Sequence, residues 1–115
     1  MTSLLDLRVF FTGLVPGLLD EAFKLGYDVT LGEVVRSQAA ADWNAAHGLG
    51  TSTSLHLVGL AVDLNLFQAG KYLLDGTGHT DLGPWWERQS HLCAWGGRFT
   101  TKDFNHYSIT FQGRR

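Results

Sequence analysis

The stretch Ser54-Leu-His-Leu-Val-Gly-Leu-Ala-Val-Asp-Leu64 places two potential metal ligands, His56 and Asp63, inside an otherwise apolar run. Seven residues separate them, which is about 23 Å along a strand, with the side chains on opposite faces, or about 10.5 Å along a helix. Zinc requires ligand atoms about 2.0–2.2 Å from the metal, so the chain must bend if both residues bind one ion. Gly59 can adopt the positive φ that such a bend needs. A carboxylate at position 63 is costly to bury unless it is paired or bound to a cation.

A second polar cluster occurs near the end of the chain. Trp95-Gly96-Gly97 is followed by Asp103 and then by His106-Tyr107. At a spacing of three, Asp103 and His106 can face one pocket from a tight turn. A third ligand from His106 would complete two imidazoles and one carboxylate, which leaves one zinc position open for water, as catalytic zinc requires.

The remaining sequence predicts an α+β domain that spans residues 1–115. Around the first stretch, Val58–Phe67 is expected to form a strand, with a hairpin turn at Ala69-Gly70. Before it, the pattern predicts a helix over 2–11, a second helix from Pro16-Gly17 to Gly26, a strand over Asp28–Val35 and a helix over Ala39–Ala46. After it, the pattern predicts a loop over Asp75–Pro84, a helix over Trp85–Cys93 and a closing strand over Tyr107–Phe111. The sheet is expected to be mostly antiparallel, with helices at the N-terminal end.

Composition excludes several classes of function. Hydrophobic residues make up 44% of the 115 positions, which argues against disorder. The formal net charge is -2 and the only basic cluster is Arg114-Arg115, so no nucleic-acid surface is expected. A single cysteine rules out a disulfide framework. No apolar run reaches about 18 residues, and the N-terminus lacks the pattern of a signal peptide. We therefore expect no membrane association and a chain made in the cytoplasm that acts after release.

These motifs resemble those of the VanY-like D-alanyl-D-alanine carboxypeptidases and the related phage endolysins. That family's pattern is S-x-H-x-x-G-x-A-x-D, then W-G-G, then D-x-x-H followed by an aromatic residue. Every fixed position is present here: Ser54, His56, Gly59, Ala61, Asp63, Trp95, Gly96, Gly97, Asp103, His106 and Tyr107. Arg36-Ser37 also resembles the family's Arg-Ser/Thr step. The resemblance covers residues 28–111, with departures at Asn105, where relatives often have proline, and at Ser108, where they often have glutamate.

The resemblance implies a hedgehog/DD-peptidase fold and a zinc peptidase that cleaves bacterial peptidoglycan stem peptides. It implies one zinc ion per chain, held by His56, Asp63 and His106, with Asp103 as the catalytic carboxylate. It places Arg36 at the substrate pocket. Ser54 could hydrogen-bond the substrate or orient a ligand, and Trp95 could line the pocket, so we expect these three residues to contact the substrate. We expect a monomeric, endolysin-type L-alanyl-D-glutamate endopeptidase, with a D-alanyl-D-alanine carboxypeptidase as the alternative. Arg36 could stabilise the oxyanion or clamp a substrate carboxylate.

Other interpretations of individual residues stay open at this point. Asp63 could be a buried ion-pair partner of Arg36, Asp103 could cap a turn, and Trp95 could be core packing. His79 with Asp81 could bind a cation from a loop.

Two other classes of function also stay open. A non-catalytic wall-binding module could keep the zinc for structure, although it has no need of a carboxylate at position 103. A cysteine amidase could use Cys93 and His106, although Cys93 fits a buried small hydrophobe better than a nucleophile.

Overall fold

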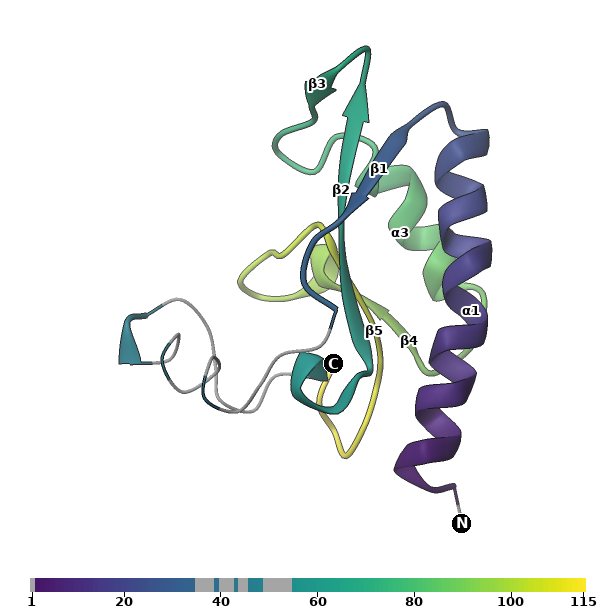
Figure 1. Cartoon of the computed structure of the whole chain (residues 1–115), viewed down its shortest axis with the longest axis vertical. Coiled ribbons are helices and arrows are strands. Elements are labelled where there is room, and N and C mark those ends of the chain that lie inside the picture. Colours follow the sequence, from purple (N-terminus) through teal and green to yellow (C-terminus); the bar gives the residue numbers. More distant parts are fainter. Residues whose placement is uncertain (1, 35–38, 40–42, 44–45, 49–54) are drawn as a thin grey trace.

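The computed structural model describes residues 2–34, 39, 43, 46–48 and 55–115. Figure 1 shows a long N-terminal helix packed against a twisted antiparallel sheet, which confirms the α+β class. The elements follow in this order: α1 (Leu4–Lys24), β1 (Asp28–Leu31), the 3-10 turn η1 (Leu55–Val58), β2 (Ala61–Gln68), β3 (Lys71–Tyr72), α3 (His79–Glu87), β4 (Cys93–Trp95), the 3-10 turn η2 (Gly96–Arg98) and β5 (His106–Ile109).

Strand β2 is the centre of the sheet. The strand order is β1-β2-β5-β4, and β3 also pairs with β2. The second half of β2 pairs with β1 and with β3, whereas its first half pairs with β5. All of these pairs are antiparallel. Because β2 and β5 are neighbours, residues near position 63 and residues near position 106 meet in space.

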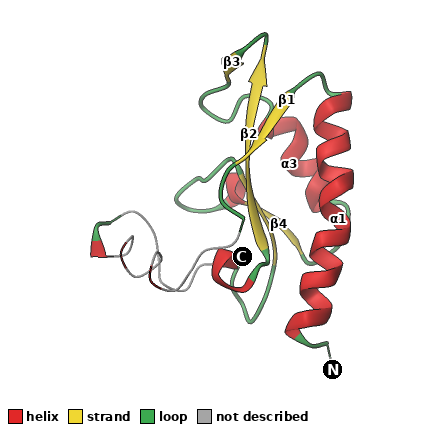
Figure 2. Cartoon of the chain, in the orientation of Figure 1, coloured by secondary structure: helices red, strands yellow, loops and turns green. Residues whose placement is uncertain are grey.

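The two faces of β2 have different environments. Val62, Leu64 and Leu66 are fully buried, whereas Asp63 and Asn65 alternate with them and are partly exposed. Side chains of successive strand residues point to opposite faces, so the alternation assigns one face to the core and the other to a more open site. Helices α1 and α3 lie on the core side of the sheet in Figure 2.

Aromatic side chains join the helices to the core face. Trp86 of α3 is fully buried and lies edge-on to Phe11 of α1 and to Tyr107 of β5. Its indole Nε1 donates to the carbonyl oxygens of Ala94 and Ser108, on β4 and β5. This side chain therefore fixes α3 over the last two strands. No helix within the described ranges is long and apolar enough to cross a membrane.

Helix α1 is continuous where the sequence predicted two helices. It begins with a capping box between Ser3 and Asp6 and runs through Pro16 to Lys24. An internal proline removes one helical hydrogen bond and costs about 3 kcal/mol. The helix continues because buried residues on both sides of the proline, Phe11 and Leu18, pack into the same core. Tertiary packing thus overrides the local stop signal.

The prediction between residues 75 and 93 was wrong in its boundaries. The expected loop over Asp75–Pro84 contains the first six residues of α3, and the expected helix over Trp85–Cys93 ends at Glu87. Glycine and proline have low helix propensity, so the local sequence does not predict a helix here. Gly83 is required because an added Cβ would lie 2.0 Å from the Trp95 ring.

The other predicted elements are confirmed with shifted ends. The hairpin turn at Ala69-Gly70 joins β2 to β3, with both residues at positive φ. The strand expected over Val58–Phe67 begins later, because residues 55–58 form η1. The predicted helix over Ala39–Ala46 lies mostly outside the described residues.

Candidate metal centre

Three side chains from three separate elements converge on the open side of β2. His56 comes from η1, Asp63 from β2 and His106 from the first position of β5. Each offers one ligand atom, and these atoms all lie within 4.8 Å of one another. In the described part of the chain this is the one group of three or more such residues with metal-binding spacing.

The geometry of this cluster fits a tetrahedral metal ion. His56 Nε2 lies 3.3 Å from Asp63 Oδ1, and His106 Nδ1 lies 3.8 Å from the same oxygen. Ligands about 2.0 Å from a tetrahedral zinc ion stand roughly 3.3 Å apart. Asp63 Oδ1 is buried and lies between these two imidazole nitrogens. A buried carboxylate oxygen between two imidazoles fits a cation at this point, because a carboxylate is costly to bury unless it is paired or bound to a cation.

A bend at Gly59 brings His56 back toward β2, as the sequence predicted. Gly59 has a φ of 72°, and its N–H points to the carbonyl of His56 at 3.4 Å. The Leu60 N–H donates to the carbonyl of Leu55 at 3.1 Å, which closes the turn. An added Cβ at position 59 would lie 2.8 Å from Arg8 Nε. Glycine is therefore required by conformation and by space.

Asp63 has a different neighbour on each side of β2, and its backbone hydrogen bonds both go to one of them. Across β5, Asp63 stands directly opposite His106 in the register. On the other side, the Gly32 N–H donates to the Asp63 carbonyl and the Asp63 N–H donates to the Glu33 carbonyl, each at 2.8 Å. The segment that follows β1 thus fixes the backbone of Asp63, and β5 places His106 beside it.

Electrostatics at His56 reflect the carboxylates around it. Burial lowers the pKa of His56, but the adjacent Asp63 carboxylate, the Val34 carbonyl and Glu33 outweigh this and raise the pKa above its ordinary value. Both imidazoles of the cluster are buried, with His56 3% and His106 5% exposed. They also pack edge to face, with ring centroids 5.3 Å apart.

Asp103 lies beside the cluster and is open to solvent. Its Oδ2 is 3.8 Å from His106 Nδ1, and its side chain is 52% exposed. Asp63 and Asp103 therefore approach the same ring nitrogen of His106 from different elements. A partly exposed carboxylate next to a metal site can exchange protons with water and with a substrate.

The Trp95-Gly96-Gly97 segment sets the position of the Asp103 loop. The Asp103 N–H and the Phe99 N–H both donate to the Gly96 carbonyl, at 3.0 and 3.1 Å. An added Cβ at Gly96 would lie 2.0 Å from the Asp103 carbonyl oxygen and 2.9 Å from His106 Cβ. The glycine therefore permits the close approach that places Asp103 beside His106.

Trp95 lies beneath this loop rather than on the open surface. It is 5% exposed, and its Nε1 donates to the Phe104 carbonyl at 2.7 Å. Gly83 and Gly97 leave room for its ring. This environment fits the packing alternative rather than a substrate contact. The other two expected substrate contacts, Arg36 and Ser54, lie outside the described residues.

The two departures from the family pattern lie close to the ligands. The Asn105 amide donates to Asn65 Oδ1 at 3.4 Å, and its carbonyl accepts from the Leu64 N–H at 2.9 Å, so it pairs with β2 just before His106. Ser108 is fully buried opposite Ala61, and its hydroxyl has no partner among the described residues. Neither departure removes a ligand.

Cys93 and His79, which the alternative interpretations of the sequence used, are buried away from the cluster. Cys93 lies in the core, and burial raises the pKa of its thiol to about 11, which disfavours a thiolate nucleophile. His79 is the first residue of α3, where burial lowers its pKa to about 4 and its Nδ1 lies 2.6 Å from the Tyr107 hydroxyl. Neither residue belongs to the cluster of His56, Asp63 and His106.

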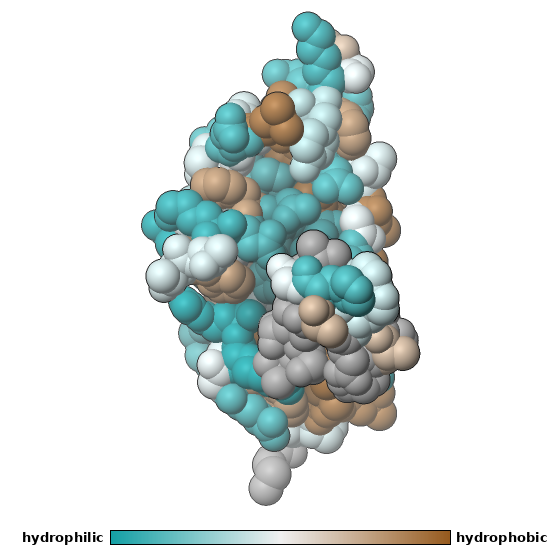
Figure 3. Space-filling model, turned by 90° about the vertical axis from the view of Figure 1, so that its left-hand side faces the viewer, coloured by the Kyte–Doolittle hydropathy of each residue, from teal (hydrophilic) through white to brown (hydrophobic). Residues whose placement is uncertain are grey.

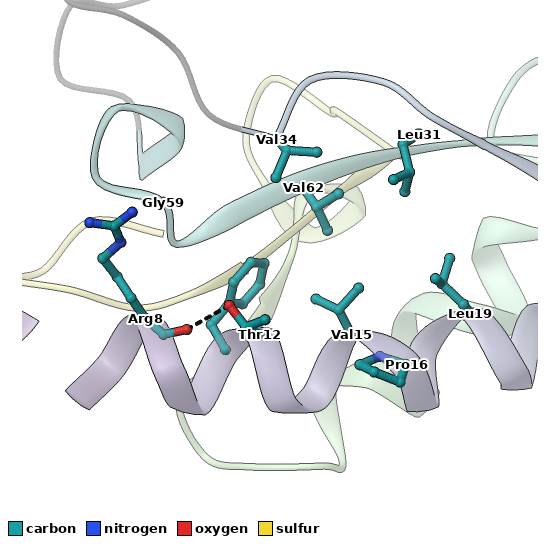
Figure 4. Close-up of a pocket in the computed structure, with 10 residues that line it drawn as sticks. Arg8, Thr12, Val15, Pro16, Leu19, Leu31, Val34, Gly59 and Val62 are labelled. Carbon is teal, nitrogen blue, oxygen red and sulfur yellow. Dashed lines mark hydrogen bonds between the residues drawn. The ribbon is translucent and has the colours of Figure 1, made fainter. Parts of the chain in front are cut away.

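The surface on the open side of the sheet is largely hydrophilic. Figure 3 shows the side of the molecule turned away from α1, where polar residues predominate around a hollow. A cavity of about 360 Å³ lies on the opposite face, between α1 and the sheet (Figure 4). Val15, Leu19, Val62 and other apolar residues line it, and none of the three residues of the cluster does. The polar surface, rather than this cavity, therefore suits a polar substrate.

Comparison with known proteins agrees with this geometry. The sequence model of a family described as D-alanyl-D-alanine carboxypeptidase matches residues 47–109, more than half of the chain. Among solved structures, the L-Ala D-Glu endopeptidase ChiX of Serratia marcescens is similar, with a TM-score of 0.69 and 25% sequence identity. That alignment covers 83% of this chain and 77% of the other. No curated protein matches the sequence. The region matched by the family includes all three residues of the cluster and Asp103.

Proposed function

Since this chain belongs to the D-alanyl-D-alanine carboxypeptidase family and is a peptidase, we propose that it is zinc-dependent and hydrolyses peptidoglycan stem peptides. The proposed bond is that between L-alanine and D-glutamate. Zinc would be held by His56, Asp63 and His106, one ion per chain. Asp103 is proposed as the catalytic carboxylate.

One observation carries the proposal. Ligand atoms of His56, Asp63 and His106 lie within 4.8 Å of one another, and Asp103 stands 3.8 Å from His106 on the open side of the site. Two imidazoles and one carboxylate form a donor set that suits zinc and leaves a coordination position open. A non-catalytic module would need the first three residues but not a solvent-exposed carboxylate beside them.

The residues divide the chemistry between binding and proton transfer. A zinc ion bound here would supply Lewis acidity, which polarises a carbonyl and lowers the pKa of a bound water. Asp103 would accept the proton of the water that attacks the scissile carbonyl and then deliver that proton to the leaving amine. Its 52% exposure gives it access to both partners. The buried imidazoles of His56 and His106 would keep their positions throughout.

The choice of bond follows the structural neighbour. The similar Serratia protein is an L-Ala D-Glu endopeptidase, whereas the family description names a D-alanyl-D-alanine carboxypeptidase, which stays the second candidate. Both substrates carry carboxylates that a guanidinium can clamp, and Arg36 is proposed for this contact, with Ser54 as a hydrogen-bonding neighbour. On the same basis we propose an endolysin-type role in which the enzyme degrades the wall after release from the cell that makes it.

The experiment incubates the purified chain with peptidoglycan, with and without a chelator, and identifies new amino termini by mass spectrometry. Chelator-sensitive appearance of D-glutamate amino termini, lost in Asp103→Ala, is the expected result. Asp20→Ala removes a carboxylate from the exposed side of α1, where it pairs with Lys24, and serves as the matched control that keeps activity.

The other outcomes are equally informative. Release of free D-alanine would keep the mechanism and assign the carboxypeptidase bond. Cleavage that neither the chelator nor Asp103→Ala affects would contradict the zinc mechanism. Zinc binding without any cleavage would favour the non-catalytic module.

A further inference from the structure

Three consecutive residues after β1 contact two of the proposed zinc ligands. Gly32 and Glu33 hold the backbone of Asp63 through two hydrogen bonds of 2.8 Å. The next carbonyl, that of Val34, lies 3.3 Å from His56 Nδ1. The Glu33 carboxylate reaches the same nitrogen, with Oε1 3.8 Å away. The segment Gly32–Val34 therefore touches the backbone of one ligand and the ring of another.

The two nitrogens of His56 face different partners. Nε2 faces Asp63 Oδ1 at 3.3 Å, inside the metal-binding group, whereas Nδ1 faces Val34 and Glu33 outside it. A neutral imidazole carries one proton, and the nitrogen without it can bind a metal. An acceptor carbonyl and a carboxylate at Nδ1 both favour the proton there. Nε2 is then the nitrogen free to bind the ion.

We propose that Glu33 is a positioning residue that, with the Val34 carbonyl, orients His56 so that Nε2 binds zinc. This inference rests on the proposed function, because it assumes that the cluster holds zinc. Glu33 would act through His56 and would touch neither the metal nor the substrate. A carboxylate on the outer nitrogen fixes the tautomer and makes the inner nitrogen a stronger ligand.

The close packing around Gly32 supports this role. An added Cβ at Gly32 would lie 3.1 Å from Asp63 Cβ, so the segment runs directly against the ligand strand. The Glu33 side chain is 32% exposed, whereas His56 is only 3% exposed. The carboxylate thus covers the outer edge of a buried ring. Sequence patterning offered no sign of this role, since Glu33 occurs as an ordinary charged residue at the end of a predicted strand.

The first measurement uses the unaltered protein. Nitrogen-15 NMR of the zinc-loaded chain distinguishes the protonated from the metal-bound nitrogen of each histidine. We expect the His56 proton on Nδ1 and zinc on Nε2. Zinc bound through Nδ1 of His56 would overturn the proposal while leaving the zinc peptidase intact, whereas failure of the unaltered chain to bind zinc would contradict the proposed function itself.

The second measurement compares zinc affinity in variants by competition with a chromophoric chelator. Glu33→Ala is expected to weaken zinc binding by about 10- to 100-fold, the usual effect of removing such a partner. Glu33→Gln, which keeps an acceptor oxygen without the charge, should bind zinc better than Glu33→Ala. Asp28→Asn removes one negative charge from the first residue of β1 and is the matched control, with unchanged affinity.

Thermal unfolding of the metal-free variants separates positioning from folding. A positioning role predicts similar unfolding midpoints for Glu33→Gln and Asp28→Asn, although their zinc affinities differ. If Glu33→Ala does not fold, Glu33→Gln decides the question. Zinc affinity within twofold of the unaltered chain in the folded Glu33 variants would show that the carboxylate does not position His56.

Discussion

Asp63 and His106 stand directly opposite each other in the antiparallel pair of β2 and β5, with Asp63 Oδ1 3.8 Å from His106 Nδ1. Forty-three positions separate them in the sequence, yet the sheet register makes them neighbours. Because side chains alternate between faces, a slip of one residue would turn His106 toward the core. The candidate metal centre therefore depends on the same pairing that holds the sheet together.

Removing either imidazole should abolish zinc binding. We expect His106→Ala to lose the bound metal, because two remaining ligands cannot hold the ion tightly. Metal analysis after dialysis against a buffer with trace zinc measures the stoichiometry. His91→Ala, at an exposed histidine outside the cluster, should retain one ion per chain. Full occupancy in His106→Ala would place the metal elsewhere.

Replacing Asp103 by asparagine should separate catalysis from metal binding. Asparagine keeps the shape of the side chain but cannot accept and return a proton. We expect kcat to fall by about 10²- to 10⁴-fold, the usual contribution of a general acid–base group. Zinc stoichiometry should stay at one per chain. Loss of the metal in Asp103→Asn would instead indicate that Asp103 is itself a ligand.

Substitution of Gly96 should disturb the Asp103 loop. A Cβ at this position would meet the Asp103 carbonyl oxygen at 2.0 Å. We expect Gly96→Ala to lower the free energy of unfolding by about 1–3 kcal/mol, as overpacking does, and to reduce peptidase activity. Chemical denaturation and the peptidoglycan assay measure the two effects.

Gly13→Ala provides a control that is expected to change the free energy of unfolding in the opposite direction. Gly13 lies on the exposed side of α1, and an added Cβ there has nothing within 4 Å. Alanine in the interior of a helix is more favourable than glycine by roughly 0.5–1 kcal/mol. Gly13→Ala should therefore stabilise the protein without affecting activity. Equal effects from the two alanine variants would mean that Gly96 does not hold the loop.

His79 should make the protein less stable in mild acid. Burial lowers its pKa to about 4 from the ordinary 6.5, so between these values the unfolded chain binds a proton that the folded chain does not. Stability is therefore greatest above pH 6.5 and falls as the pH drops toward 4. The full effect of lowering this pKa from 6.5 to about 4 is about 3 kcal/mol.

The difference between two variants isolates this effect from the other histidines. His79→Asn keeps an amide near the Tyr107 hydroxyl but does not titrate in this range. Its free energy of unfolding, measured by denaturant titration, should depend less on pH between 6.5 and 4 than that of the unaltered chain. His91→Asn, at an exposed position, should leave the pH dependence unchanged. Identical slopes for all three proteins would rule out His79 as the source.

The local sequence predicted the bend between His56 and Asp63 because the constraints on that bend are local. A carboxylate in an apolar strand conflicts with burial, and a glycine four residues earlier permits the bend that brings His56 alongside it. The spacing of Asp103 and His106 likewise follows from one tight turn. The geometry of these residues matches those predictions, since the three proposed ligands converge and Gly59 has a φ of 72°.

The boundaries of the helices could not be predicted in the same way. Pro16 and Pro84 both lie inside helices, although proline usually ends a helix. Phe11 and Leu18 in α1 and Trp86 in α3 gain enough from burial to offset the lost hydrogen bonds. That gain depends on strands distant in sequence, so no local window contains it.

By itself, the sequence determined which residues can bind a metal, where the chain bends between His56 and Asp63, and which strand carries the carboxylate. The tertiary structure decided the rest. Only the register of β2 and β5 places His106 opposite Asp63, and only the close packing at Gly96 places Asp103 beside His106. The contact of Glu33 with His56 likewise exists only after folding. Residue identity fixes donor chemistry, whereas the distances among donors arise from long-range pairing that no short segment encodes.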